Sequence, residues 1–276
     1  MAGFDLVQAS ELPVDVLAAT FNAGYEGYAF PVRLDAQAFL ALNEPSDVDF
    51  ARSRVALSQG EPVGICLLAV RGDLGWIGGL GIAASARRRG LGRLLMEAVL
   101  EEASAAGLRG VSLEVLERND AAITLYERLG FATRRMLEVW TMDAAAPPSR
   151  AVVAALDWAQ AWIAANRAQP EPWQRADESL AHLVERAVEL EGLVFADRAA
   201  AVLRRAGDGV SILQLVARDE DAAVELLAAA RARGATLRFV NVPEGDPAST
   251  ALQRLGGRLE VRQLEMARPD EAAVID

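Results

Sequence analysis

The sequence contains no lysine, so all 28 of its basic side chains are arginines. Catalysis through a lysine Schiff base and phosphate binding by a P-loop lysine are therefore excluded. Cysteine and histidine occur once each, as Cys66 and His182, which excludes an internal disulfide and a metal site built from several such ligands. Cys66 lies in an apolar run and is expected to be a buried small side chain, while His182 is expected to be an ordinary helix residue. No metal is expected.

The chain is also short of positive charge. Its 39 acidic residues outnumber the arginines and leave a formal net charge of −11, a field that repels nucleic acid, so no nucleic-acid partner is expected. No apolar run is long enough to cross a bilayer, and the first residues lack a secretory signal pattern. We therefore expect a cytoplasmic protein with no membrane partner. The 52% of hydrophobic residues suffice for the core of one large or two ordinary domains.

A proline pair divides the chain. It lies in residues 143–151, where it interrupts both helices and sheet ladders. The sequence predicts a domain over residues 1–143, a linker over 144–150 and a second domain over 151–276.

The first half mixes strand and helix periodicity and predicts an α/β fold with a mixed sheet. Alternation or apolar runs predict strands over 4–9, 54–60, 62–73, 74–82 and 109–117, and helical spacing predicts helices over 12–25, 90–107 and 119–131. Short connections predict that the second, third and fourth strands form a meander. The fourth strand, the helix from Gly90 and the fifth strand predict a parallel pair with a crossover helix.

Three arginines precede a Gly-x-Gly at the start of this crossover helix, in the sequence ARRRGLGRLL at 86–95. The first N–H groups of a helix have no acceptor within it and lie at the positive end of its dipole, so they can bind a pyrophosphate. Gly90 and Gly92 would let a phosphate approach the main chain. The alternative is a solvated basic helix start.

This turn and the later sequence NDAAITLYERLGF resemble the GCN5-related N-acetyltransferase (GNAT) superfamily. The first signature has the spacing Arg87-x-x-Gly90-x-Gly92, and the second is matched at Asn119, Ala122, Leu125, Tyr126, Gly130 and Phe131. The resemblance covers residues 4–142. A dinucleotide-binding Rossmann fold is disfavoured, because the strand before the glycines belongs to a meander and no acidic residue is placed for a ribose.

The resemblance implies that acetyl-CoA is the acyl donor. Its pyrophosphate would bind the turn, and its pantetheine arm would pair with backbone groups of the preceding strand. The residues implied in donor binding are Leu80, Ile82, Arg87, Arg88, Arg89, Gly90, Leu91, Gly92, Arg93 and Asn119.

The resemblance also implies catalytic roles. Tyr126 matches the position whose phenol protonates the departing thiolate, and the alternative is an aromatic residue packed on the sheet. Glu114 resembles a catalytic glutamate of ribosomal-protein alanine acetyltransferases, and a glutamate on the sheet surface is equally compatible. The acceptor pocket is expected after the first helix, at Tyr25, Glu26 and Tyr28, whose aromatic rings could instead fill the core.

The second half contains a weak internal repeat. Residues 234–257 repeat the strand, acidic loop and helix of 107–131, and the strand, turn and helix before them are repeated as well. The equivalent turn has no glycine and carries Asp219, Glu220 and Asp221, which would repel a pyrophosphate. Either Leu252 or Gln253 stands opposite Tyr126. We therefore expect a smaller, degenerate GNAT-like domain, the alternative being an unrelated α/β domain.

Together these features predict an N-acetyltransferase that moves an acetyl group to a primary amine of a small molecule or of a protein N-terminus, by direct transfer in a ternary complex. A non-catalytic acyl-CoA-binding sensor or scaffold is the alternative function, and both halves could also shape one acceptor groove. The sequence does not identify the acceptor, and it leaves a homo-oligomer open.

Overall fold

The structure, a computed structural model, describes residues 3–27, 32–143 and 145–269. Its contacts divide the chain into two compact units, with Met1–Arg134 and Glu265–Asp276 in unit 1 and Arg135–Leu264 in unit 2. The division lies inside a strand and not at the proline pair, so the boundaries at 143 and 151 stay a prediction.

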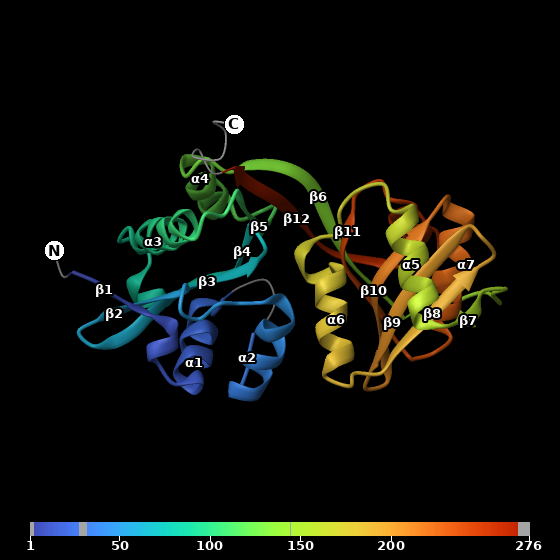
Figure 1. Cartoon of the computed structure of the whole chain (residues 1–276), viewed down its shortest axis with the longest axis horizontal. Helices are drawn as coiled ribbons and strands as arrows, with labels where there is room; N and C mark the ends of the chain where they lie inside the picture. Colours follow the sequence, from blue (N-terminus) through green and yellow to red (C-terminus); the bar gives the residue numbers. More distant parts are fainter. Residues whose placement is uncertain (1–2, 28–31, 144, 270–276) are drawn as a thin grey trace. The chain divides into compact units, whose positions relative to one another are not determined.

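Unit 1 is a mixed sheet with helices on both faces (Figure 1). Its elements are β1 (Asp5–Gln8), α1 (Val14–Gly24), α2 (Ala36–Asn43), β2 (Arg54–Ser58), β3 (Glu61–Arg71), β4 (Leu74–Ile82), α3 (Leu91–Ala105), β5 (Gly110–Leu116), α4 (Asp120–Arg128) and the end of β12 (Arg258–Pro269). The strand order is β1-β2-β3-β4-β5-β12. Strands β1 to β4 pair antiparallel and β4 pairs parallel with β5, which confirms the predicted meander and crossover.

Apolar side chains on the two faces of β3 explain this arrangement. Ile65 and Leu67 are fully buried with Phe21 of α1 and Phe39 of α2. On the other face, the Cβ position of Gly64 lies 3.1 Å from a side-chain carbon of Leu95 in α3. The sheet is therefore sandwiched between α1 with α2 and α3 with α4. Cys66 lies on β3 between these layers, fully buried as expected, and burial raises the pKa of its thiol.

Helix α2 was not predicted from the sequence. It has only eight residues and is capped by Asp35, whose side chain accepts a hydrogen bond of 2.8 Å from the Ala38 N–H. A short helix of this kind depends on tertiary packing, here of Phe39, more than on its periodicity.

Unit 2 is built in a similar way. Its elements are most of β6 (Ala132–Met142), β7 (Val152–Ala154), α5 (Leu156–Asn166), α6 (Asp177–Glu185), β8 (Leu190–Phe195), β9 (Ala199–Ala206), β10 (Gly209–Ala217), α7 (Glu220–Arg231), β11 (Leu237–Pro243), α8 (Pro247–Arg254) and most of β12. The strand order is β12-β6-β11-β10-β9-β8-β7. Strands β10 and β11 pair parallel, as β4 and β5 do in unit 1, and α7 connects them as α3 connects β4 and β5.

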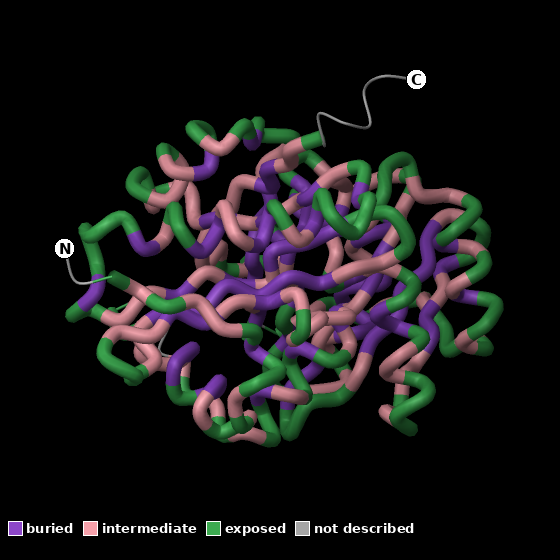
Figure 2. The backbone as a smooth tube through the Cα atoms, turned by 60° about the vertical axis from the view of Figure 1, so that its left-hand side comes forward, coloured by how far each residue is buried: buried purple, intermediate pink, exposed green. Residues whose placement is uncertain are grey.

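Alternate residues of β9 show how unit 2 is layered. Ala199, Ala201 and Leu203 belong to the core under α7 and α8, whereas Ala200 and Val202 belong to the core under α5 and α6. Because successive strand residues point to opposite faces, both faces of this sheet are covered. Figure 2 shows the same pattern, with long buried stretches along strands.

Strand β12 was not predicted from the sequence. In unit 1 the end of β12 lies beside β5, and in unit 2 the rest of β12 lies beside β6. The Cβ position of Gly110 on β5 is 3.4 Å from the carbonyl oxygen of Arg268 on β12. A strand from the end of the chain therefore contributes to the sheet that carries the first repeat.

Candidate active site

The start of α3 has the geometry of an anion site. Gly90 is its N-cap residue, with φ of 79°, and it provides no side-chain cap. Arg88 also has a positive φ, of 59°, so two left-handed residues bend the main chain just before the helix. The N–H groups of the first helical turn have no helical acceptor and are available to an anion. A Cβ at Gly90 would meet nothing within 4 Å, so glycine is needed there for its backbone conformation.

Strands β4 and β5 part beside this turn. Their parallel pairing runs from Leu74 with Gly110 to Ile77 with Leu113, and no later β4–β5 pair is found in this described stretch. Beyond that point β4 continues to Ile82 without β5 as its neighbour. Backbone groups at residues 78–82, which include the predicted Leu80 and Ile82, therefore have no β5 ladder on this side.

Most arginine side chains near the turn are engaged by the protein itself. Arg87 donates to the carbonyls of Ile82, Gly24 and Glu26. The guanidinium of Arg89 lies 4.7 Å from the centre of the Phe4 ring. Arg93 donates a hydrogen bond of 2.7 Å to Glu97. No partner is found for Arg88 among the described residues. The cradle is thus formed by main chain, and we expect the guanidinium groups to add to it only as nearby charge.

Glu114 is held on β5 by a tryptophan. Burial alternates along β5, so Glu114 points away from the buried Leu113 and Val115, as predicted. Trp76 of β4 is paired with Ser112, two residues before Glu114, and therefore shares its face. The indole Nε1 of Trp76 donates a hydrogen bond of 2.7 Å to Oε2 of Glu114. A hydrogen bond of this kind orients the carboxylate.

Tyr126 lies on α4 and is only 6% exposed. Its ring lies 5.9 Å from that of Phe131, centroid to centroid, in a tilted arrangement. Asn119 is the N-cap of α4, and its side chain accepts a hydrogen bond from the Ala122 N–H. A Cβ at Gly92 would be 3.4 Å from Leu125, so the glycine lets α3 and α4 approach each other closely.

The predicted acceptor residues lie at the end of α1. Tyr25 stacks on Phe21 with 4.5 Å between ring centroids, and its hydroxyl is 3.0 Å from the position of a Cβ on Gly79. Tyr25 therefore covers Gly79 and Gly81 of β4, in the part of this strand that no longer pairs with β5. Glu26 contributes its carbonyl to Arg87, while Tyr28 lies outside the described residues.

The equivalent turn of unit 2 is closed by an acid. Only two residues separate β10 from α7, and the second of these, Asp219, accepts a hydrogen bond of 2.9 Å from the Ala222 N–H. Its carboxylate also pairs with Arg198, at 2.6 Å. This hydrogen bond from Arg198 and the one from Ala222 hold the pKa of Asp219 below its usual range. The helix start of unit 2 is thus satisfied by a side chain and presents a negative charge.

An arginine fills the place where the strands of unit 2 part. The pairing of β10 with β11 stops at Ile212 with Phe239. Directly beyond it, the guanidinium of Arg175 donates to the carbonyls of the next residues of both strands, namely Leu213 at 3.2 Å, Val240 at 3.4 Å and Asn241 at 2.8 Å. It also pairs with Glu171 at 2.9 Å, and both side chains are buried. Arg175 thus bonds backbone acceptors of both strands at the point where they part.

The two catalytic candidates also have no counterpart in unit 2. Pairing begins at Gly110 on β5 and at Leu237 on β11, so Glu114 corresponds to Asn241, four residues on. Counted back from the helix C-caps Leu129 and Leu255, Tyr126 corresponds to Leu252, which is buried, and not to the exposed Gln253. Neither asparagine nor leucine can exchange a proton as a glutamate and a phenol can.

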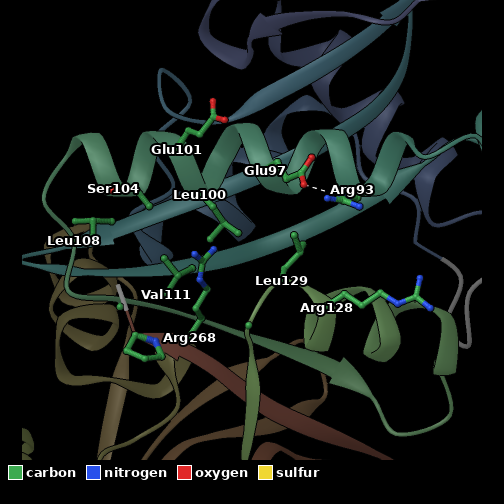
Figure 3. A pocket seen from close by; sticks show the side chains of 14 residues that line it. Arg93, Glu97, Leu100, Glu101, Ser104, Leu108, Val111, Arg128, Leu129 and Arg268 are labelled. Carbon is green, nitrogen blue, oxygen red and sulfur yellow. Dashed lines mark hydrogen bonds and ion pairs between the residues drawn. The ribbon is translucent and has the colours of Figure 1, made fainter. Parts of the chain in front are cut away.

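A cavity of about 550 Å³ lies on the α3 and α4 face of unit 1 (Figure 3), and neither Glu114 nor Tyr126 is among the residues that line it. Its apolar floor includes Leu100 and Val111, and Arg268 points into it. No group of three or more His, Cys, Asp or Glu side chains that could hold a metal is found in the described residues. Within the same ranges, none of the helices combines the length and apolar character that crossing a bilayer requires.

Sequence reasoning missed Trp76 of unit 1 and Arg175 of unit 2. Trp76 had no signal beyond its place in a strand, and Arg175 lies in a short 3-10 helix with no motif. The contact of Arg87 with a phosphate stays a prediction, and its pairing with the carbonyls of Gly24 and Glu26 was not predicted because only the fold brings them within its reach.

Comparison with known proteins supports the interpretation of unit 1. Residues 16–131 match the model of the acetyltransferase (GNAT) family. A mycothiol acetyltransferase of Geodermatophilus obscurus is 34% identical over 161 residues, which cover 50% of this chain and 51% of that protein. A ribosomal protein bS18-alanine N-acetyltransferase of Salmonella typhimurium is 51% identical over 45 residues, or 16% of this chain and 30% of that protein. The chain thus spans about half the length of the first relative and less than a third of the second.

A solved structure extends the similarity in fold to both units. The GCN5-related N-acetyltransferase of Sphaerobacter thermophilus matches with a TM-score of 0.72 and 15% identity, covering 96% of this chain and 95% of that one. At this identity the similarity shows the fold alone. Residues 16–131 match the acetyltransferase (GNAT) family, and the whole-chain similarity, together with the parallel strand pair that both units contain, shows that the fold of such acetyltransferases extends over both units.

Proposed function

We propose that this protein is an acetyl-CoA-dependent N-acetyltransferase that moves an acetyl group to a primary amine by direct transfer in a ternary complex. The observation that carries the proposal is the place in unit 1 where β4 and β5 part. The uncapped, glycine-containing start of α3 follows β4, and Glu114 and Tyr126 belong to β5 and to the helix that follows it.

The donor would bind through the main chain. Its pyrophosphate would accept hydrogen bonds from the first N–H groups of α3, and its pantetheine arm would pair with β4 where β5 is absent. The thioester would then lie between the two strands. Holding donor and amine together converts a bimolecular reaction into an effectively unimolecular one.

Two side chains would move protons. A free phenol has a pKa of about 10 and is protonated at neutral pH, so this type of side chain at position 126 suits protonation of the departing thiolate. Glu114, oriented by Trp76, would accept a proton from the ammonium group of the acceptor, directly or through water. Each role is expected to contribute about 10²–10⁴-fold to the rate.

One donor site per chain follows from the contrast between the units. In unit 2 the helix start carries Asp219, the carbonyls at the parting strands are bonded by Arg175, and Asn241 and Leu252 replace the proton-transferring pair. We infer that unit 2 neither binds acetyl-CoA nor catalyses transfer. The same inference applies to the second domain that the sequence predicts over 151–276.

The acceptor we propose is a primary amine on a small molecule or a protein N-terminus. The names of the two curated relatives refer to mycothiol and to the alanine of a ribosomal protein. Tyr25 and Glu26 adjoin β4 on the α1 face, and the net charge of −11 favours a cationic amine over an anionic one. A cytoplasmic location also remains a proposal, and the oligomeric state is open.

The test is an amine panel assayed with acetyl-CoA by detection of free thiol, with mass spectrometry of the products. We expect one class of primary amine to gain 42 Da as thiol is released, a mass increase of about one acetyl group. Tight binding of acetyl-CoA without thiol release for any amine would instead support a non-catalytic sensor.

A further inference from the structure

Arg87 occupies an unexpected position for a residue of a phosphate-binding turn. Its guanidinium turns back from the turn and bonds to three backbone carbonyls. Nε donates to the carbonyl of Ile82 at 2.9 Å, and Nη2 donates to the carbonyls of Gly24 at 3.1 Å and Glu26 at 2.9 Å. One end of this network is the last residue of β4, and the other is the end of α1.

The end of α1 also touches β4 directly. An added Cβ on Gly24 would lie 2.5 Å from the Cα of Gly81, so the two main chains meet with no side chain between them. Tyr25 covers the next part of β4, with ring atoms 3.5 Å from the Cβ position of Gly81. Asn22 near the end of α1 is bonded to Leu34. Its side chain donates a hydrogen bond of 2.8 Å to the carbonyl of Leu34 and accepts one of 2.9 Å from the N–H of Leu34.

These contacts place Arg87 between the two substrate regions of the proposed reaction. Residues 88–92, directly after it, form the turn for the donor pyrophosphate, and Gly24 to Glu26 border the proposed acceptor side. A guanidinium has donors fixed in a planar fork, so it can hold several carbonyls in one geometry. A movement of the turn on donor binding would therefore be transmitted to the end of α1.

We propose that Arg87 is a positioning residue that couples binding of acetyl-CoA to the geometry of the acceptor side. The proposal rests on the proposed function for its kinetic consequence, but the bonding network itself does not. Coupling between two sites is reciprocal, so the donor should strengthen acceptor binding and the acceptor should strengthen donor binding by the same factor.

The matched variants are Arg87→Ala and Arg88→Ala. Both remove one positive charge from the same turn, and both are expected to weaken acetyl-CoA binding to a similar extent through that charge. Only Arg87→Ala removes the hydrogen bonds to Gly24 and Glu26. Full-length protein of each variant is examined by hydrogen exchange of the amides of residues 22–27, with and without CoA at saturating concentration.

In the absence of ligand, Arg87→Ala should speed exchange in residues 22–27, whereas Arg88→Ala should not. This result is independent of any enzymatic activity, and unchanged exchange in Arg87→Ala would overturn the proposal. In wild type, CoA should slow exchange in the same residues, and this protection should be lost in Arg87→Ala at matched saturation. Protection of equal size in both variants would also overturn it.

Kinetics separate positioning from folding. With the amine found by the panel, Arg87→Ala should raise the KM for that amine about 10-fold at saturating acetyl-CoA, within the 5–150-fold range of typical couplings. Arg88→Ala should affect the KM for acetyl-CoA alone. If no amine is turned over, the proposed function fails, while the exchange experiment still decides whether Arg87 couples the two regions.

Discussion

Replacement of Arg175 by methionine tests the account of unit 2 most severely. Arg175 is 3% exposed, pairs with the buried Glu171 and lies over the ring of Phe239 at 4.4 Å. Methionine keeps much of the side-chain length and the apolar contact with that ring. It removes the charge and every hydrogen bond to the parted strands.

The expected loss is large because one partner of a buried ion pair remains behind. Breaking such a pair typically costs about 3–5 kcal/mol. Backbone carbonyls that lose their donor add about 1–3 kcal/mol each if water cannot reach them, although the two costs overlap. We therefore expect Arg175→Met to lower the free energy of unfolding of unit 2 by about 3–5 kcal/mol.

The loss should depend on pH. Burial raises the pKa of Glu171, with Arg175 opposing that shift. Without Arg175 the pKa of the Glu171 carboxyl is raised further. The folded protein therefore holds the proton of this carboxyl more strongly than the unfolded chain does. Stability from such a group is present below the unfolded pKa of about 4.3 and is lost as pH rises through the folded pKa. Arg175→Met should therefore be less destabilising at acid pH than at neutral pH.

The assay is urea unfolding followed by hydrogen exchange in peptides of β10 and β11, because these report on unit 2 alone. The double variant Glu171→Leu with Arg175→Met is the control, and it should recover part of the loss since no unpaired charge stays buried. A loss below about 1 kcal/mol, within the range of an ordinary hydrogen bond, or a loss independent of pH, would refute the reasoning.

Three further changes test individual residues. Tyr126→Phe keeps the ring but removes the proposed acid, so turnover should fall about 10²–10⁴-fold with acetyl-CoA affinity unchanged in calorimetry; an unaltered rate would reject this role. Glu114→Gln still accepts the hydrogen bond from Trp76, so its Tm should match that of wild type. Its kcat/KM should fall, and the acid limb of the pH profile of kcat/KM should disappear. A retained acid limb would show that another group is the base. Asp219→Ala removes the cap and the pair with Arg198, so Tm should fall at neutral pH. Since the pKa of Asp219 is lowered in the folded state, this Tm difference should shrink as pH drops below the ordinary value of about 3.9, and a constant difference would contradict the assignment.

Local patterns in the sequence predicted most of unit 1. Alternation and helical spacing identified its main strands and helices, and Gln59 and Gly60, with φ of 54° and 84°, form the short turn between β2 and β3. The turn at Gly90 was predicted because glycine lets a phosphate approach the main chain, and its left-handed backbone, with φ of 79°, was found only in the structure.

Long-range pairing could not be predicted in this way. Strand β12 has an ordinary strand composition, and nothing local indicates that its end lies beside β5, more than a hundred residues away in the sequence. The repeat indicated a second similar unit and left Leu252 and Gln253 as alternatives. The structure decides for Leu252, because α8 is one residue shorter than α4 and only Leu252 is buried.

The partners of individual arginines were also beyond sequence reasoning. Arg87 and Arg175 carry the same side chain, yet one bonds to the end of α1 and the other to two parted strands. Which carbonyls a guanidinium reaches depends on where the chain brings distant backbone. Glu114 was predicted to face away from the core by the period of its strand, whereas its hydrogen bond with Trp76 needed the register of β4 against β5.

The central claim is that one acetyl-CoA binds per chain, on the turn that contains Gly90. Isothermal titration of acetyl-CoA into the full-length protein and into Gly90→Val measures it most directly. Valine at a φ of 79° is strained, because branched side chains avoid left-handed backbone, so the turn should lose its anion-binding shape. The account predicts a stoichiometry of about one for wild type and a strongly weakened affinity for Gly90→Val at unchanged folding. A stoichiometry of about two, or equal affinity in the variant, would contradict it.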